Sequence, residues 1–353
     1  MVSHAVDDES PIRTVLERYP DLAAATVEPL GAGLINTTYL VSAGDERFVL
    51  QRVNPIFDPA IHDNIAAVTE RLAERGLATP RLVGDREGRR FVDLGAGGVW
   101  RLSTFVAGVT FDTLRGAGQA RAAGALVGRF HAALDGLDHR FVGLRLGVHD
   151  TPRHLATLRD ALANHGDHPL AARTRALGAA ILAAAEALAP LPALPPAIGH
   201  GDLKFNNLRF AGAAPPADED AVCLVDLDTV GPMSLAFELG DAWRSWCNPH
   251  GEERADAIFD LDVFAASLDG YAGAIGRGLS RDERAALLGG VEWISLELAA
   301  RFAADAVNER YFGWDPARFA TRGEHNLVRA ESQWALHGAV IATRRERARL
   351  LGA

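Results

Sequence analysis

Two short polar clusters near the middle of the chain carry side chains suited to phosphate chemistry. The first, HGDLKFNN, runs from His200 to Asn207, and the second, DLDTVG, runs from Asp226 to Gly231. Transfer of a phosphoryl group from a nucleotide needs a carboxylate that orients or deprotonates the attacking hydroxyl. It also needs oxygen ligands for the metal ions that bridge the phosphates. The two clusters together hold both kinds of group.

The residue types suggest a role for each position. Asp202 is the candidate catalytic carboxylate, and Lys204, two positions later, could reach the transferred phosphoryl group. Asn207 and Asp226 offer hard oxygen ligands of the kind that Mg²⁺ prefers, and Asp228 is a second candidate ligand or an acceptor beside the first. The joint spacing of Asp202, Asn207 and Asp226 argues against the common alternative, in which Asp202 only caps a helix or a turn.

Lys204 is also the only lysine in the sequence, because every other member of the Lys and Arg group is an arginine. The two side chains differ in shape and hydration. A chain that keeps one lysine beside Asp202 and Asn207 favours a requirement for a compact ammonium group there. The alternative is that one lysine has survived by chance on a solvated loop.

The segments around the clusters indicate how they are presented. Residues 211–220 are rich in Pro, Ala, Gly and acidic residues and predict an exposed turn, and the apolar run 221–225 predicts a buried strand. The order is therefore loop, short strand, turn, buried strand and acidic loop. This layout brings the two polar clusters together.

The rest of the chain divides by pattern into a mixed first part and a helical second part. We predict an α+β protein with a first domain at 1–107, a small antiparallel sheet with a helix, and a mainly helical second domain at 108–353. The elements predicted in the first domain are a helix at 11–25, strands within 27–53 with a turn at 44–46, a helix at 58–75, and strands at 81–83, 90–94 and 99–108. Those in the second are helices at 117–135, 153–189 and from 238 onward.

The first domain also offers a small-residue turn between two strands. Gly31 and Gly33 would let the backbone approach phosphate oxygens, and Asn36 and Thr37 follow directly. Hairpin turns often use glycine for conformational reasons alone. The turn gains weight from lying upstream of the strand FVLQRVN, and we treat these four residues as candidate nucleotide contacts.

Composition restricts the range of partners. The chain has 353 residues, a net charge of −10 and no concentrated basic tract, which gives no support for nucleic-acid binding. No apolar stretch reaches the ~20 residues needed to span a bilayer, and the acidic start MVSHAVDDES is unlike a secretory signal. We expect a cytoplasmic protein with no membrane partner. The oligomeric state is not indicated.

The two clusters resemble the catalytic segments of protein-kinase-like phosphotransferases. HGDLKFNN looks like the pattern H-x-D-x-K-x-x-N, and DLDTVG stands in the place of the metal-binding D-F-G segment. The form H-G-D followed by D-x-D is similar to the aminoglycoside phosphotransferase superfamily. That resemblance implies a two-lobe fold, with a small sheet N-lobe and a helical C-lobe. It also implies that Asp202 is the base and that Asn207 and Asp226 bind metal.

Several further stretches are most similar to the N-acetylhexosamine 1-kinases, namely GLINTTYLV, LQRVN, FELGDAWRS, LELAARF and HNLVRA. Those enzymes use ATP and Mg²⁺ to phosphorylate the anomeric hydroxyl of N-acetylglucosamine or N-acetylgalactosamine. By that resemblance Arg301 contacts the sugar. Trp243 and Arg244 are further candidate acceptor contacts, and the alternative for the tryptophan is an ordinary core position.

One departure from the kinase pattern concerns the third strand. Kinases usually place a lysine there to hold the nucleotide phosphates, whereas this sequence has Gln51 followed by Arg52. The resembling sugar kinases also carry Gln-Arg at this point. Neighbouring residues of a strand point to opposite faces, so only one of the two can serve the nucleotide. Glu70 is the candidate for the helix acid that would pair with it.

The sequence thus predicts an ATP- and Mg²⁺-dependent kinase for the anomeric hydroxyl of a hexosamine. One alternative is a kinase of the same superfamily that acts on an aminoglycoside, an amino alcohol or a different sugar. A second is a nucleotide-binding module without activity, against which the complete set Asp202, Asn207 and Asp226 argues. A protein kinase is disfavoured because PMSLAFELGD follows Gly231 directly and leaves little room for an activation loop.

Overall fold

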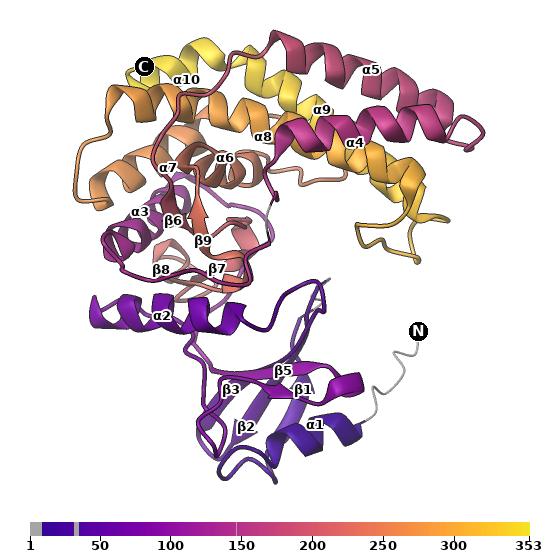
Figure 1. Ribbon diagram of the computed structural model, residues 1–353. Helices are drawn as coiled ribbons and strands as arrows, with labels where there is room; N and C mark the ends of the chain where they lie inside the picture. Colours follow the sequence, from indigo (N-terminus) through magenta and orange to yellow (C-terminus); the bar gives the residue numbers. More distant parts are fainter. Residues whose placement is uncertain (1–8, 32–34, 146) are drawn as a thin grey trace. The chain divides into compact units, whose positions relative to one another are not determined.

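The computed structural model describes residues 9–31, 35–145 and 147–353 of the protein (Figure 1). The chain divides into two compact units. Two short segments that the sequence assigned to the second domain, 136–145 and 227–230, pack with the first unit. Unit 1 consists of Met1–Ala107, Gly136–Arg145 and Leu227–Val230, and unit 2 of Gly108–Asp135, Leu146–Asp226 and Gly231–Ala353.

Unit 1 is built on a five-stranded antiparallel sheet in the order β1-β2-β3-β5-β4. The turn predicted at 44–46 joins β2 to β3, and the candidate strand at 81–83 forms only an isolated bridge, from Leu82 to Ser103. The strands are β1 (Thr26–Pro29), β2 (Thr37–Ala43), β3 (Glu46–Val53), β4 (Val92–Asp93) and β5 (Val99–Thr104).

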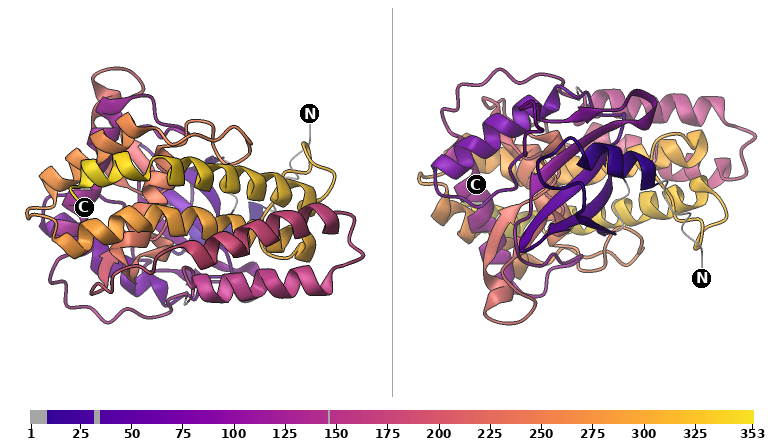
Figure 2. Two further views of the ribbon diagram at one scale, coloured as in Figure 1. Left: turned by 90° about the horizontal axis from the view of Figure 1, so that it is seen from above. Right: turned by 90° about the horizontal axis from the view of Figure 1, so that it is seen from below.

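The two faces of this sheet differ in chemistry, as alternation along a strand requires. One face is apolar and packs against helix α1 (Glu9–Leu16) and the turns after it (Figure 1; Figure 2, right). The other face carries a row of three cross-strand neighbours, Thr38, Gln51 and Arg101. Thr38, Gln51 and Arg101 therefore form a polar row on the face of the sheet opposite the apolar core.

The helices of unit 1 correct one prediction and confirm another. The helix expected at 11–25 ends at Leu16, because Pro20 disfavours helical geometry at the residue before it and Asp21 is left-handed, with φ of 60°. The helix expected at 58–75 is α2 (Ile61–Glu74). It is followed by the C-cap Arg75 and by Gly76, whose φ of 75° suits glycine at the end of a helix.

Unit 2 is mainly helical, and Figure 2 (left) shows α4, α5, α8 and α9 side by side. The helix predicted over 153–189 is two helices, since the segment 165–170 breaks it and Asp150 caps the first. The helices are α3 (Ala117–Leu134), α4 (Thr151–Asn164), α5 (Ala171–Ala187), α6 (Leu235–Trp246), α7 (Leu261–Ala274), α8 (Arg281–Asn308), α9 (Arg322–Ala342) and α10 (Arg344–Leu351).

Two small antiparallel pairs in unit 2 present the polar clusters. Strand β7 (Leu208–Phe210) pairs with β8 (Ala221–Leu224), and β6 (Ala197–Gly199) pairs with β9 (Gly231–Met233). The first cluster is the loop between β6 and β7, and the second follows β8. This is the order of loop, strand, turn, strand and loop that the sequence predicts.

Glycines let two helix pairs of unit 2 approach closely. A Cβ atom built on Gly290 of α8 would lie 2.1 Å from the Ala236 carbonyl oxygen of α6. One built on Gly124 of α3 would meet the Ser267 carbonyl oxygen of α7 equally tightly. These backbone atoms cannot move without shifting a helix, so the crossings require glycine. None of the described helices combines the length and apolar character needed to cross a bilayer.

Gly290→Ala should therefore lower the free energy of unfolding by about 1–3 kcal/mol, the usual cost of overpacking. Gly338→Ala is the matched control, because a Cβ atom there meets nothing within 4 Å. At an exposed helix position alanine is more stable than glycine by about 0.5–1 kcal/mol. Thermal or denaturant unfolding measures both variants. Equal stabilities would contradict the close α6–α8 crossing.

Candidate active site

The loop from His200 to Asn207 is fixed in unit 2 by one buried carboxylate, that of Glu238 on α6. The side chain of Glu238 is 2% exposed. Its Oε1 accepts the backbone N–H of His200 at 2.7 Å, and its Oε2 accepts that of Gly201 at 2.9 Å. His131 on α3 lies 3.3 Å from Oε1 and also contacts the Tyr271 hydroxyl at 3.0 Å. Glu238 thus ties the loop to two helices.

The charged form of Glu238 is the one these partners stabilise. Burial opposes it, but the contact with His131 and the backbone N–H of His200 outweigh burial and lower the pKa of Glu238. A carboxylate that accepts backbone N–H groups holds its charge well below its ordinary pKa. The brace therefore persists throughout the neutral pH range.

His200 links the two polar clusters. Its Nε2 lies 2.9 Å from the Val225 carbonyl oxygen, which can only accept, so Nε2 carries the proton. Nδ1 is then left to accept the backbone N–H of Asp202, at 3.3 Å. Between them Gly201 has a φ of 82°, which favours glycine and explains the middle residue of H-G-D.

Two more side chains of α6 hold the same loop. The Ser245 hydroxyl oxygen accepts the Phe205 N–H at 3.1 Å, and the Trp246 indole N–H donates to the Leu203 carbonyl at 2.8 Å. Positions seven and eight residues after Glu238 lie on the same helix face. Sequence reasoning missed Ser245, although its spacing from Glu238 was the available signal.

The loop brings Asp202, Lys204 and Asn207 together. Lys204 Nζ lies 3.0 Å from Asp202 Oδ2. The Asn207 amide nitrogen donates to the Asp202 carbonyl oxygen at 2.8 Å and reaches Oδ2 at 3.3 Å. Among the described residues, both contacts of this carboxylate are to Oδ2. Oδ1 of Asp202 and Oδ1 of Asn207 are therefore the atoms that can serve a ligand.

Lys204 lies in a strongly acidic environment. Burial lowers the pKa of its ammonium, but Asp202, Glu252 and Asp241 together outweigh burial and raise that pKa well above its ordinary value. The side chain is still 42% exposed. Lys204 is thus a permanent, accessible positive charge beside Asp202.

Asp226 and Asp228 have different environments. Val225 donates its backbone N–H to the Asn207 carbonyl at 2.9 Å, which brings the start of the second cluster to the first. Asp226 follows in the left-handed region, with φ of 64°. Asp228 belongs to unit 1, where Arg101 and Asn36 occupy its two oxygens. A metal at Asp228 would have to displace these partners.

The candidate nucleotide contacts of unit 1 are mostly engaged with the protein. Asn36 donates to Asp228 Oδ2 at 2.7 Å and accepts the Asn54 N–H at 2.9 Å. Gly31 has a φ of 75° and Thr37 is exposed at the start of β2. Gly33 lies outside the described residues. Asn36 is therefore a structural anchor here, while Gly31 and Thr37 remain accessible to a ligand.

Gln51 and Arg52 lie on opposite faces of the sheet and have different surroundings. Gln51 Oε1 accepts from Nε and Nη2 of Arg101, at 2.9 and 2.8 Å, and its Nε2 donates to Thr38. Arg52 lies on the opposite face of the sheet and is exposed. Glu70 on α2 is also exposed. The basic group on the polar face is Arg101, which the sequence did not single out.

A second set of charged groups surrounds Lys204 in unit 2. Nε and Nη2 of Arg244 donate to Asp241 at 3.0 and 2.9 Å, and Nη1 donates to Glu252 at 2.6 Å. Arg244 is 3% exposed. The pKa of its guanidinium is raised, since the two carboxylates outweigh burial. Arg244 therefore positions Asp241 and Glu252, which act on Lys204.

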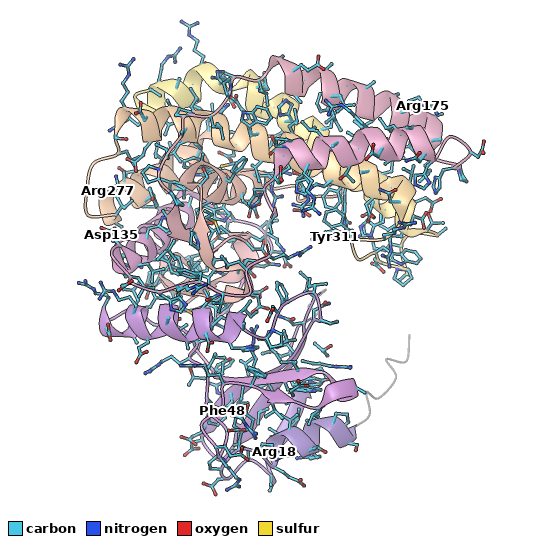
Figure 3. The ribbon with its side chains drawn as sticks, viewed as in Figure 1. Arg18, Phe48, Asp135, Arg175, Arg277 and Tyr311 are labelled. Atoms are coloured by element: carbon cyan, nitrogen blue, oxygen red, sulfur yellow. The ribbon has the colours of Figure 1, made fainter. Side chains whose placement is uncertain are left out.

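The remaining candidate acceptor contacts differ in exposure. Trp243 is 1% exposed, packs against Phe264 and donates to Ser267, so it is a core residue in this structure. Arg301 on α8 lies 3.8 Å from Glu297, with its guanidinium 5.5–5.8 Å from the rings of Phe312 and Tyr311. Tyr311, labelled in Figure 3 on the loop after α8, is 49% exposed.

That loop is anchored by the residues of the HNLVRA motif and by Asp305. Asp305 accepts the backbone N–H groups of 310–312 at 2.8–2.9 Å and the Asn326 side chain at 2.9 Å. His325 accepts the Asp315 N–H and contacts Glu253 at 2.7 Å. These residues position Tyr311 and are themselves buried.

Comparison with known proteins identifies the family that this site fits. The model of the phosphotransferase enzyme family matches residues 26–274. A homoserine kinase of Methylobacterium radiotolerans is 32% identical over 219 residues, which span 62% of this chain and 61% of that enzyme. The match thus covers about three fifths of the length of that relative.

Solved structures share the fold. A microcompartment-associated aminopropanol kinase has a TM-score of 0.59 at 18% identity, covering 96% of this chain and 98% of its own. Amicoumacin kinase, solved with AMP-PNP, Ca²⁺ and amicoumacin, has a TM-score of 0.60 at 14% identity, covering 93% of each. The kinase-like fold predicted from the sequence, a small antiparallel-sheet lobe and a helical lobe, is confirmed.

Glu238→Gln tests the brace on the loop. The new amide places an NH₂ group opposite a backbone N–H, and a buried donor without an acceptor costs about 1–3 kcal/mol. We expect amide hydrogen exchange at His200 and Gly201 to become about 10–100 times faster. Glu186→Gln, at an exposed position of α5, is the control and should change neither amide. Unchanged exchange in Glu238→Gln would contradict the brace.

Proposed function

We propose that this chain, which belongs to the phosphotransferase enzyme family, transfers the terminal phosphoryl group of ATP to a hydroxyl group of a small molecule. The observation that carries the proposal is the Glu238-braced loop, on which Lys204 and Asn207 both lie within hydrogen-bond reach of Asp202. Catalysis of this kind depends on positioning and on stabilising charge.

Each side chain of the loop has a separate task. Asp202 Oδ1 accepts the proton of the acceptor hydroxyl while that oxygen forms its bond to the terminal phosphorus. The bond from this phosphorus to the bridging oxygen breaks, and the electron pair leaves with ADP. Lys204, held beside Oδ2 at 3.0 Å, keeps the carboxylate oriented and offers its positive charge to the transferred group.

The oxygen atoms of Asn207 and Asp226 fit a divalent metal. Among the described residues no three His, Cys, Asp or Glu side chains gather as a metal site. Mg²⁺ usually binds through one or two protein oxygens and the substrate phosphates, so Asn207 and Asp226 would suffice to hold it. When bound, Mg²⁺ neutralises charge on the phosphates. Asp228 takes no part as a ligand, because its oxygens are paired with Arg101 and Asn36.

The acceptor that we favour is an N-acetylhexosamine, phosphorylated at its anomeric hydroxyl. Support comes from the resemblance of GLINTTYLV, LQRVN and HNLVRA to the hexosamine 1-kinases. It also comes from the half-exposed ring of Tyr311 beside Arg301, since sugar rings bind against aromatic side chains that have a polar neighbour.

An alcohol that bears an amino group, such as an amino alcohol or the hydroxy amino acid homoserine, is the second candidate. The homoserine kinase relative favours it. So do the charges of unit 2, where Glu252 and Asp241 could attract an ammonium group and Arg301 a carboxylate. Several residues of the sugar-kinase motifs, Asn36 and Gln51 among them, bind other protein groups. The resemblance in those motifs therefore says more about the scaffold than about the acceptor.

Asp202→Asn should lower kcat by about 10²–10⁴-fold, the usual contribution of a positioned acid or base. The amide keeps the shape of the carboxylate but cannot accept the proton. Asp160→Asn, on an exposed position of α4, is the control and should keep wild-type turnover. Thermal unfolding checks that both variants stay folded. A folded Asp202→Asn variant with normal turnover would refute the role of Asp202.

An acceptor screen with ATP and Mg²⁺ decides between the acceptor classes. The panel contains N-acetylglucosamine, N-acetylgalactosamine, homoserine, aminopropanol and an aminoglycoside. Phosphorus NMR distinguishes an anomeric phosphate from an ester of an ordinary alcohol. We expect an anomeric phosphate from an N-acetylhexosamine. Exclusive phosphorylation of homoserine would establish the second candidate, and no transfer to any compound would favour an inactive nucleotide-binding protein.

A further inference from the structure

The third strand of unit 1 has Gln51 where kinases place a lysine, yet the polar face of the sheet still carries a basic residue. Arg101 on β5 is directly opposite Gln51 on β3 and donates to Gln51 Oε1 through Nε and Nη2. Arg101 is 4% exposed. A guanidinium so deeply buried needs a charged partner as well as a neutral one.

That partner is Asp228. Nη1 of Arg101 forms an ion pair with Asp228 Oδ1, and the side chains of both residues are at most 5% exposed. Asp228 Oδ2 accepts from Asn36 at 2.7 Å, and Asn36 in turn accepts the Asn54 N–H. Both carboxylate oxygens of Asp228 are thus held by unit 1, the unit to which Leu227–Val230 belongs.

The positive charge of Arg101 is balanced by the negative charge of Asp228. The Asp228 carboxylate is compensated at one oxygen by the Arg101 guanidinium and at the other by the Asn36 amide. His62 of α2 is 1% exposed and lies within the field of both residues. Burial, assisted by Arg101, lowers its pKa to about 4, so His62 is neutral at pH 7. No other described group is needed to compensate the Arg101–Asp228 pair.

We propose that Arg101 is a positioning residue for phosphoryl transfer: its ion pair with Asp228 holds Leu227–Val230 against the sheet and thereby fixes the backbone of the preceding residue, Asp226. The inference rests on the proposed function, in which Asp226 is a metal ligand. Asp226 lies in the left-handed region, with φ of 64°, which a residue with a side chain adopts only when its surroundings impose it. The pair two residues later supplies that restraint.

The first test measures the restraint without activity. The Val230 N–H donates to the Leu227 carbonyl at 3.2 Å and reports on the order of the segment. In Arg101→Gln we expect hydrogen exchange at Val230 to become at least tenfold faster. Arg90→Gln removes an exposed ion pair with Asp63 and is the matched control, with unchanged exchange at Val230. Unchanged exchange in Arg101→Gln overturns the proposal.

The second test separates positioning from a direct contact with the nucleotide. In Arg101→Gln we expect kcat to fall at least tenfold and the metal concentration for half-maximal rate to rise at least fivefold, with KM for ATP changed less than threefold. Arg101→Lys keeps the charge opposite Asp228 and should restore part of the loss. A tenfold rise of KM for ATP with unchanged metal dependence would make Arg101 a phosphate contact and overturn the proposal.

A double variant keeps the test decisive if Arg101→Gln unfolds. Arg101→Gln with Asp228→Asn removes both charges and leaves two amides that can still bond, which is better tolerated than one unpaired charge. Its kcat should be no lower than that of either single variant, because the two residues act as one unit. Additive losses overturn the proposal. If the wild type transfers no phosphoryl group, the proposed function fails, while exchange at Val230 still tests the restraint.

Discussion

The constraint on which the site depends is the burial of a single carboxylate, that of Glu238, against two consecutive backbone N–H groups. A loop that presents Asp202 cannot also satisfy its own backbone by regular pairing, because the chain must turn there through Gly201 at φ of 82°. Glu238 replaces the missing acceptors. Its charge makes both hydrogen bonds stronger than neutral ones, so the loop is firmly held where the candidate catalytic carboxylate, Asp202, is attached.

The second polar cluster is also held in a fixed conformation, but by a different kind of contact. Its segment Leu227–Val230 is held through a side-chain charge, Asp228, and not through backbone groups. An ion pair at this depth adds little net stability but is costly to break on one side only. The ion pair therefore favours one conformation of Leu227–Val230 over the alternatives. In the sequence Asp226 lies between the two arrangements, two residues after the end of β8, which pairs with β7, and directly before the held segment.

The sequence predicted what local pattern determines. The β2–β3 hairpin, α2 and the order of elements around the clusters follow from turn residues and apolar spacing, and all are present. The helix at 11–25 was overextended because its apolar spacing continues past Leu16, where Pro20 and the sheet core take over. Arg101 was missed because its partners, Gln51 and Asp228, are far away in sequence. Strand register brings Gln51 opposite Arg101, and tertiary packing brings Asp228 to it, and neither is visible in the spacing along the chain.

The number of partners at each site explains why arginine is used at two buried positions and lysine at position 204. Arg101 uses three nitrogens of its planar group to serve two partners, Gln51 and Asp228, and a lysine could not satisfy both. Arg244 bridges Asp241 and Glu252 in the same manner. Lys204 instead contacts one carboxylate oxygen and stays 42% exposed. An arginine in place of Lys204 would donate to Asp241 and Glu252 and be held by them, as Arg244 is. In the proposed reaction, a lysine ammonium on its flexible stem would be able to leave Asp202 when a phosphoryl group arrives, a reason for a lysine in place of an arginine at this position.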